Sequence, residues 1–149
     1  MHVIASKAVC SKKLYHLNPG VWQEHCGKCT GTCKRSYRQR FDLVSGGTDN
    51  HLMLVDLRSK NITGKEFEIA LDKANITCNK NAIPNDPQKP GITSGVRIGT
   101  PAVTTRGLNE ADMDVIAECM ALIAADPEGN NEAVKAKVKA LTDKYPLYA

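Results

Sequence analysis

The sequence predicts a small α+β domain in which helices cover one face of a sheet. Three observations support this prediction. An apolar run at residues 52–57 follows a Gly-Gly turn, three later segments repeat apolar residues at helical spacing, and two shorter segments between them favour strands. The resulting order of β, α, β, loop, β, α, α is typical of α+β domains, and 149 residues suffice for one domain with its own core.

The first strand and the first helix have clear boundaries. The run LMLVDL at residues 52–57 follows Gly46 and Gly47, which predicts a turn leading into a buried strand. Thr63 and Glu66 have the spacing of a capping box, so we expect a helix over residues 63–75. Its core-facing residues would be Phe67, Ala70, Leu71 and Ala74.

A proline-rich loop separates two further strands. We expect a short strand over residues 76–79 and another over residues 96–99. Between them, residues 82–92 contain three prolines, which exclude a helix and predict an ordered loop. Loops of this kind often carry binding residues.

Two helices complete the predicted domain. Asn109 caps a long helix that ends before the sequence Asp-Pro-Glu-Gly at residues 126–129, and a last helix covers residues 131–144. The apolar stripes of both helices predict core packing. Their members are Met113, Ile116, Ala117, Met120, Ile123 and Ala124 in the first helix, and Val134, Val138 and Leu141 in the second.

The composition narrows the class of protein. Hydrophobic residues make up 42% and charged residues 24%, and no apolar run approaches the roughly 20 residues needed to span a bilayer. The N-terminal residues lack the pattern of a secretory signal, so we expect a cytoplasmic protein with no membrane partner. Cys78 and Cys119 lie in periodic segments, which predicts free thiols.

Three blocks of sequence occur in the same order as the signature blocks of a known enzyme family. They are LVSGGTDNHLMLVDL at residues 43–57, NKNAIPNDP at residues 79–87 and TSGVRIGTPAVTTRG at residues 93–107. All three resemble serine hydroxymethyltransferase, and the resemblance extends over residues 41–149. The segment MHVIASKAV at residues 1–9 is similar to the family segment that follows a phosphate-contacting Gly-Gly-Pro turn.

The resemblance implies a fold-type I pyridoxal phosphate enzyme that moves the hydroxymethyl carbon of serine to tetrahydrofolate and leaves glycine. The cofactor supplies the electron sink for that chemistry. Residues 41–149 would then form the small C-terminal α+β domain. Residues 1–40 would correspond to the end of the large domain and the helix that connects the two domains.

Two residues match family binding positions. Arg97 matches the position that binds the substrate carboxylate, for which a guanidinium offers a bidentate fork. Asn81 matches a position that hydrogen-bonds the folate, and its amide can both donate and accept. His51 and Arg106 also lie in matching blocks, and we expect structural roles for them.

The family's cofactor-binding lysine lies in a Thr-His-Lys motif upstream of the segment that resembles residues 1–9. The chain begins after that motif, and no residue in it replaces the lysine. We therefore expect no covalently bound pyridoxal phosphate and no catalysis by this chain alone. Family members form dimers with shared active sites, so pairing with itself or with full-length subunits is expected.

Residues 11–40 differ in composition from the rest of the chain. Seven of the twenty basic residues but only one acidic residue lie there, and the segment has neither helical nor strand periodicity. It contains Cys26, Cys29 and Cys33, with His16 and His25 nearby, which form a weak zinc-site pattern. A nucleic-acid interface is the other hypothesis, based on Arg35, Tyr37, Arg38 and Arg40.

A shift of reading frame explains the same segment more simply. One base earlier, the codons of residues 12–18 permit Glu-Ala-Leu-Ser-Pro-Glu. One base later, those of residues 22–34 permit Gly-Lys-Asn-Ile-Val-Glu-Asn-Ala-Gln-Glu-Leu-Ala-Ser. Both strings resemble the family's connecting helix. We therefore favour compensating frameshifts over a metal or nucleic-acid site, and we expect residues 11–40 to be poorly ordered or poorly packed.

Three hypotheses for the function follow. The first is a C-terminal fragment of serine hydroxymethyltransferase that retains Arg97 and Asn81 and is inactive alone. The alternative is a non-catalytic module whose Cys-rich basic segment binds metal or nucleic acid. The third is a regulatory fragment that pairs with intact enzyme subunits.

Overall fold

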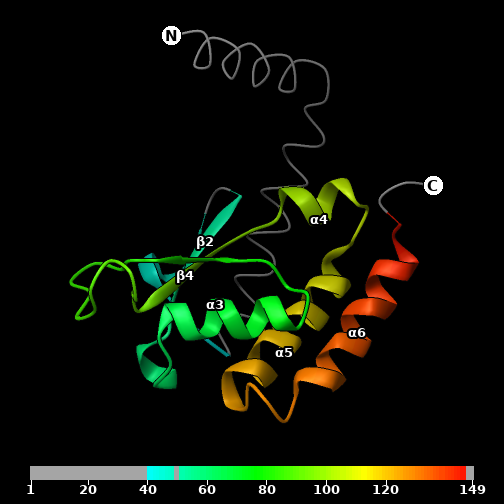
Figure 1. The fold of residues 1–149 in the computed structure, drawn as a ribbon. Coiled ribbons are helices and arrows are strands. Elements are labelled where there is room, and N and C mark those ends of the chain that lie inside the picture. The colour runs from blue at the N-terminus through cyan, green and yellow to red at the C-terminus, as the bar shows by residue number, and fades with distance from the viewer. Residues whose placement is uncertain (1–39, 49–50, 147–149) are drawn as a thin grey trace, which may run out of the picture.

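The computed structural model describes residues 40–48 and 51–146 (Figure 1). The described strands are β1 (Asp42–Leu43), β2 (Leu52–Asp56), β3 (Asn79–Asn81) and β4 (Gly95–Gly99). The described α-helices are α3 (Gly64–Lys73), α4 (Pro101–Thr105), α5 (Glu110–Ala125) and α6 (Asn131–Lys144). Two short 3-10 turns, η2 (Val44–Gly46) and η3 (Arg58–Lys60), flank β2.

The four strands form one antiparallel sheet in the order β1-β2-β4-β3. In the central pair, Val55 lies opposite Val96 and Met53 lies opposite Ile98. Figure 1 shows α3 along this sheet, with α5 and α6 beyond it on the same side. The α+β class and the helix-covered sheet face predicted from the sequence are therefore confirmed.

The core lies between the sheet and these helices. Met53, Val55 and Val96 point from the sheet toward α3, and we call this side of the sheet the helix face. The residues that meet them from the helices are Phe67, Ala70, Leu71, Ala117, Met120, Ile123 and Val134. Nine of the thirteen residues predicted for the core are buried, because the apolar stripes of the helices face the same side of the sheet. The other four, Ile116, Ala124, Val138 and Leu141, are half-buried.

Capping boxes start both of the helices for which the sequence predicts a cap. In α3, Thr63 Oγ1 accepts a hydrogen bond from Glu66 N at 3.2 Å, and Glu66 Oε2 accepts one from Thr63 N at 3.0 Å. In α5, Asn109 and Asp112 make the equivalent pair of bonds, at 3.1 and 2.8 Å. Each box satisfies backbone donors that a helix N-terminus otherwise leaves without partners.

The predicted strand at residues 76–79 was placed too early, since β3 covers Asn79–Asn81. The C-terminus of α3 accounts for the error. Asn75 has a left-handed φ of 61° and donates to Asp72 O at 2.9 Å, while Ile76 N donates to Leu71 O at 2.9 Å. This is a Schellman motif, which uses the residues that follow the helix and delays the strand.

The sequence analysis also missed β1 and α4. Helix α4 is a single turn that starts with a proline at its first position, where the absent N–H costs nothing. Two or five residues are too few for periodicity to reveal an element, so these two appear only in the folded chain.

The N-terminus of α3 packs directly on the beginning of β4. Gly64 N donates to Thr93 O at 2.9 Å, and a Cβ on Gly64 would clash with Thr93 Oγ1 and with the carbonyl oxygen of Gly95. Thr93 is buried and has a left-handed φ of 59°, an uncommon conformation for a β-branched residue. A glycine at residue 64 is therefore required for this close approach.

Candidate functional site

The register of the sheet places both predicted site residues on its second face. Side chains alternate along a strand, and Val96 and Lys80 belong to the helix face. Arg97 and Asn81 therefore point to the opposite side. We call this side the Arg97 face, and its residues include Leu52, Leu54, Asp56, Asn79, Asn81 and Arg97.

Arg97 occupies the middle of this face. It pairs with Leu54 on one side and with Asn79 on the other. Its side chain is exposed and has no hydrogen-bond or ion-pair partner among residues 40–48 and 51–146. A guanidinium held on a central strand without a protein partner is available to bind an anionic group of a ligand.

Asn81 is a diagonal neighbour of Arg97, because Asn81 pairs with Gly95 and Asn79 pairs with Arg97. Diagonal neighbours in an antiparallel sheet are about 7–8 Å apart. The Asn81 amide donates from Nδ2 to Ala82 O at 2.8 Å, which turns the side chain along its own strand. Its Oδ1 makes no hydrogen bond within the described part of the chain and can accept one from a ligand.

Asp86 organises the loop that joins β3 to β4. Its carboxylate accepts hydrogen bonds from Ser94 N at 2.9 Å, Ser94 Oγ at 2.7 Å, Gln88 N at 2.9 Å and Ile83 N at 3.2 Å. Burial alone would raise the pKa of this carboxyl, but the bonds from Ser94, Gln88 and Ile83 lower the pKa to about 2. Asp86 therefore fixes both ends of the loop: Ile83 lies two residues after Asn81, and Ser94 lies two residues before Val96.

Ile83 holds the same loop against the sheet. It is 5% exposed, and a Cβ on Gly95 would lie 2.5 Å from Ile83 Cγ2 and 2.8 Å from Val55 O. Gly95 thus leaves room for Ile83 to cover the sheet beside Asn81. The loop predicted from the three prolines is ordered by one carboxylate and one apolar contact, neither of which the sequence analysis identified.

With this geometry established, the chain can be compared with known proteins. A family profile described as "Serine hydroxymethyltransferase" matches residues 1–120. Two proteins named serine hydroxymethyltransferase, from Acidovorax sp. (strain JS42) and Acidovorax ebreus (strain TPSY), are each 51% identical to the chain over 150 residues. The alignments cover 99% of this chain and 36% of each relative.

The chain belongs to the serine hydroxymethyltransferase family. The resemblance found in the three sequence blocks is thereby confirmed, and the chain spans about a third of the length of the curated relatives that it matches. Neither comparison supports the alternative of a metal- or nucleic-acid-binding module. The Cys-rich segment on which that alternative depends lies within residues 1–39, outside the described residues. The metal or nucleic-acid site and the predicted poor order of residues 11–40 therefore remain predictions.

The described strands contain one lysine, and it lies on the helix face. The lysine on the strand beside Arg97 is Lys80, whose Nζ lies 2.7 Å from Glu68 Oε2 on the helix face. Within the ranges that the structure describes, the strands therefore offer no lysine amine to the Arg97 face. No group of three or more His, Cys, Asp or Glu residues there could hold a metal ion.

The other residues of the matching blocks have structural contacts. Arg106 donates from Nε to Tyr145 O at 2.8 Å and from Nη2 to Thr142 O at 3.4 Å, which fastens the end of α6 to α4. The carbonyl oxygen of His51 accepts a bond from Thr100 N at 3.1 Å, which joins the start of β2 to the start of α4. These contacts agree with the structural roles expected for Arg106 and His51.

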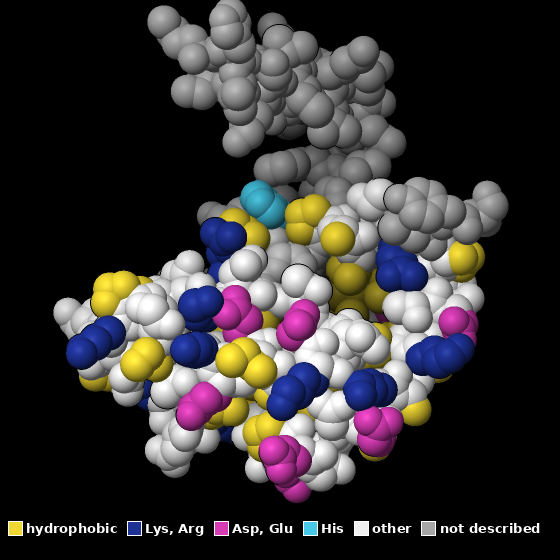
Figure 2. All heavy atoms as spheres, viewed as in Figure 1, with side chains coloured by type: hydrophobic (Ala, Val, Ile, Leu, Met, Phe, Trp, Pro, Cys, Tyr) yellow, Lys and Arg dark blue, Asp and Glu magenta, His cyan; other side chains and the backbone are white. Residues whose placement is uncertain are grey.

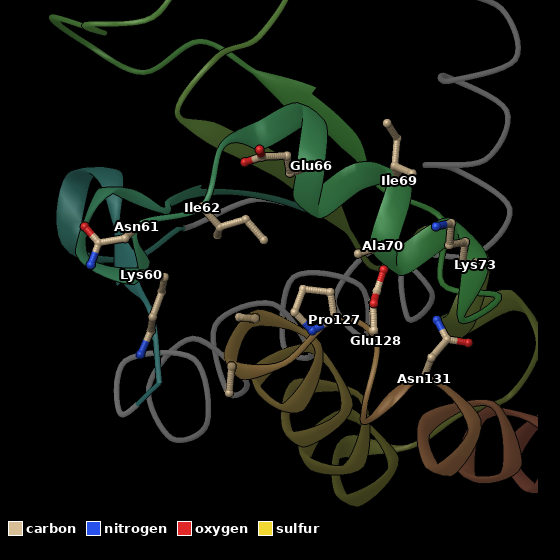
Figure 3. A pocket seen from close by; sticks show the side chains of 12 residues that line it. Lys60, Asn61, Ile62, Glu66, Ile69, Ala70, Lys73, Pro127, Glu128 and Asn131 are labelled. Atoms are coloured by element: carbon tan, nitrogen blue, oxygen red, sulfur yellow. The ribbon is translucent and has the colours of Figure 1, made fainter.

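Two hollows lie away from the Arg97 face. A groove of about 800 Å³ runs between α3 and the turn that joins α5 to α6, with Ile69 at its edge (Figure 3). An apolar cavity of about 290 Å³ lies between the sheet, α4, α5 and α6. Cys78 lines this cavity, and burial raises the pKa of its thiol to about 11. Cys78 and Cys119 are both free thiols, as predicted.

The visible surface carries charges of both signs. Figure 2 shows Lys and Arg side chains interspersed with Asp and Glu. Ion pairs of the described residues include Lys137 with Glu118 at 2.6 Å and Lys135 with Glu132 at 2.9 Å. In the described ranges, no helix is long and apolar enough to cross a membrane.

Proposed function

We propose that the chain is the C-terminal small domain of a fold-type I serine hydroxymethyltransferase and supplies part of a composite active site. Arg97 would bind the carboxylate of serine or glycine, and Asn81 would hydrogen-bond tetrahydrofolate. The observation that carries the proposal is the position of Arg97 in a member of this family: exposed, on a central strand, without a partner in the described chain, and diagonal to Asn81.

The complete reaction converts serine and tetrahydrofolate to glycine and 5,10-methylenetetrahydrofolate. It needs residues that belong to the part of the relatives that this chain does not match. We therefore infer that residues 1–149 alone are inactive and that pyridoxal phosphate is not bound covalently to them. Association with another copy or with a complementary subunit is part of the proposal, as is the cytoplasmic location predicted from the sequence.

The two-domain assignment belongs to the same proposal. Residues 41–149 would be the small domain, and residues 1–40 would be the end of the large domain with the connecting segment. The compact core and the capped helices of the described residues support the first half of this assignment. The predicted frameshift of residues 11–40 would affect only the connection between the domains.

The test is a pair of chimeras with the serine hydroxymethyltransferase of Acidovorax sp. (strain JS42). In the first chimera, residues 41–149 replace the matching part of that protein. In the second chimera, all of residues 1–149 replace the part that they match. We expect the first to bind pyridoxal phosphate, seen by absorbance, and to produce glycine from serine. The second should be much less soluble or less active if residues 11–40 have the wrong reading frame.

Variants of the first chimera test the residue roles. Arg97→Ala should raise KM for serine about 10- to 100-fold, because charge-assisted hydrogen bonds are the strong ones. Asn81→Ala should raise KM for tetrahydrofolate about fivefold, the typical value of one hydrogen bond. The matched control is Arg58→Ala, which removes an exposed arginine that pairs with Asp56. A chimera that binds the cofactor and turns over serine equally well with Arg97→Ala contradicts the proposal.

A further inference from the structure

Asn79 is the direct partner of Arg97 in the sheet. The pairing of β3 with β4 places Asn79 opposite Arg97 and Asn81 opposite Gly95. Directly opposite residues on one face of an antiparallel pair have Cβ atoms about 4.5–5.5 Å apart. By this register, the Cβ of Asn79 lies closer to the Cβ of Arg97 than does that of Asn81, the residue that the sequence analysis selected.

Lys80 fixes the direction of the Asn79 side chain. Its backbone N donates to Glu68 Oε1 at 3.0 Å and its Nζ donates to Glu68 Oε2 at 2.7 Å, so both contacts hold Lys80 on the helix face. Neighbouring residues of a strand point to opposite faces. Asn79 is consequently held on the Arg97 face by a contact that lies on the other side of the sheet.

The Asn79 amide is available for binding. The residue is exposed, and its side chain has no hydrogen-bond partner in the ranges 40–48 and 51–146. A carboxylate has about four lone-pair positions, of which a bidentate guanidinium uses two. An adjacent Nδ2–H donor can occupy a third.

We propose that Asn79 is a further substrate-binding residue, which donates a hydrogen bond from Nδ2 to the carboxylate that Arg97 binds. This inference rests on the proposed function, since it assumes that the ligand of Arg97 is the carboxylate of an α-amino acid. It adds a residue that the resemblance did not assign and explains why a polar, exposed amide lies opposite the arginine.

The experiment is an NMR titration of the ¹⁵N-labelled chain of 149 residues with glycine. Acetate, which has the carboxylate without the amine, and methylammonium, which has the amine without the carboxylate, serve as probes of the recognised group. We expect glycine and acetate, but not methylammonium, to shift the resonances of Asn79 and Arg97. Asn79→Ala should weaken glycine binding about three- to tenfold, and Arg97→Ala should abolish it.

Three further variants complete the design. Asn79→Gln should retain part of the affinity because it keeps the amide, whereas Asn79→Asp should lose more than Asn79→Ala because it adds a like charge beside the carboxylate. Asn131→Ala removes a matched amide from α6, on the helix side, and should leave binding unchanged. An unchanged amide spectrum away from the Arg97 face shows that each variant is folded.

Two outcomes overturn the inference, and they are distinguishable. If Arg97→Ala abolishes glycine binding while Asn79→Ala binds like the wild-type chain, Asn79 is not a ligand-binding residue and the proposed function stands. If glycine binds Arg97→Ala as well as it binds the wild-type chain, the carboxylate site itself is wrong and both proposals fall. If glycine does not bind the isolated wild-type chain, the same variants are compared in the first chimera by their KM for serine. There, an unchanged KM for Asn79→Ala overturns this inference alone, and an unchanged KM for Arg97→Ala overturns both proposals.

Discussion

The two faces of one small sheet differ in the contacts that their side chains make within the described chain. On the helix face, Val55 and Val96 are fully buried and Lys80 pairs with Glu68. On the Arg97 face, Arg97 and Asn79 are exposed and make no side-chain hydrogen bond within the described residues. Adjacent residues of the same two strands point to opposite faces. Substitutions one position apart should therefore differ in effect: on the helix face they should lower the free energy of unfolding, and on the Arg97 face they should leave it nearly unchanged.

The largest expected effect tests the helix face. Phe67 is fully buried, and its ring centroid lies 6.0 Å from that of Phe41. Phe67→Ala should lower the free energy of unfolding by about 3–5 kcal/mol, because it removes apolar contacts and leaves a cavity. Urea unfolding followed by circular dichroism measures this. Leu54→Ala, from the Arg97 face, is the control, and an equal loss in both variants would remove the distinction between the faces.

The loop beside the Arg97 face should be the next most sensitive feature. Asp86→Ala leaves the donors of Ile83, Gln88 and Ser94 without their acceptor and should cost about 2–3 kcal/mol of unfolding free energy. Urea unfolding at pH 7 provides the value. Asn81 and Arg97 resonances should shift in the same variant, since the loop positions both strands. A loss below about 0.5 kcal/mol would show that the carboxylate does not organise the loop.

The pH dependence of this contribution has a definite sign. The folded-state pKa of Asp86 is about 2, below the ordinary value of 3.8, so its stabilisation is fully present above pH 3.8 and is lost as the pH falls toward 2. Other carboxyls titrate in the same range, so the relevant quantity is the difference in unfolding free energy between the wild-type chain and Asp86→Asn. That difference should shrink between pH 4 and pH 2. A constant difference would exclude the carboxylate charge as its source.

A smaller effect is expected where α3 meets β4. Gly64→Ala places a Cβ against Gly95 O and Thr93 Oγ1, which should cost about 1–3 kcal/mol by overpacking. Gly91→Ala is a matched control, because a Cβ there has no atom within 4 Å. Thermal unfolding of both variants gives the comparison. If Gly64→Ala were as stable as Gly91→Ala, the close contact between helix and strand would not be present in solution.

The smallest expected effect tests the Arg97 face. Arg97→Ala and Asn79→Ala should each change the free energy of unfolding by no more than about 0.5 kcal/mol, because exposed side chains without partners contribute little. The same urea titrations measure this. A loss above about 1 kcal/mol for either variant would indicate a structural role. If both variants have the unfolding free energy of the wild-type chain but bind glycine more weakly, the Arg97 face contributes to binding and not to stability.

Much of the fold was predictable because local signals are strong where caps coincide with an apolar stripe. Thr63 with Glu66, and Asn109 before the stripe of α5, defined those helices to within two residues of the structure. The strand β3 was displaced because a Schellman motif at Asn75 and Ile76 depends on backbone conformation. The single-turn helix α4 and the two-residue strand β1 are too short to have a detectable period.

The candidate site was only half predictable. Arg97 and Asn81 were selected by resemblance, residue by residue, whereas Asn79 and Asp86 carried no local signal that separated them from other polar residues of β3 and the loop after it. What distinguishes Asn79 is the residue that lies opposite it, and what distinguishes Asp86 is the set of three residues that donate to it. Both properties join positions that are 2 to 18 residues apart in the chain.

The sequence by itself determined the family, the α+β class, the capped helices and the identity of the core, because these follow from motifs, caps and periodicity that are local in the chain. Only the tertiary structure decided which polar residues share a face with Arg97. The physical reason is the register between β3 and β4. A shift of one residue would turn Asn79 and Asn81 into the core, and that register is set by contacts between distant residues, such as Lys80 with Glu68.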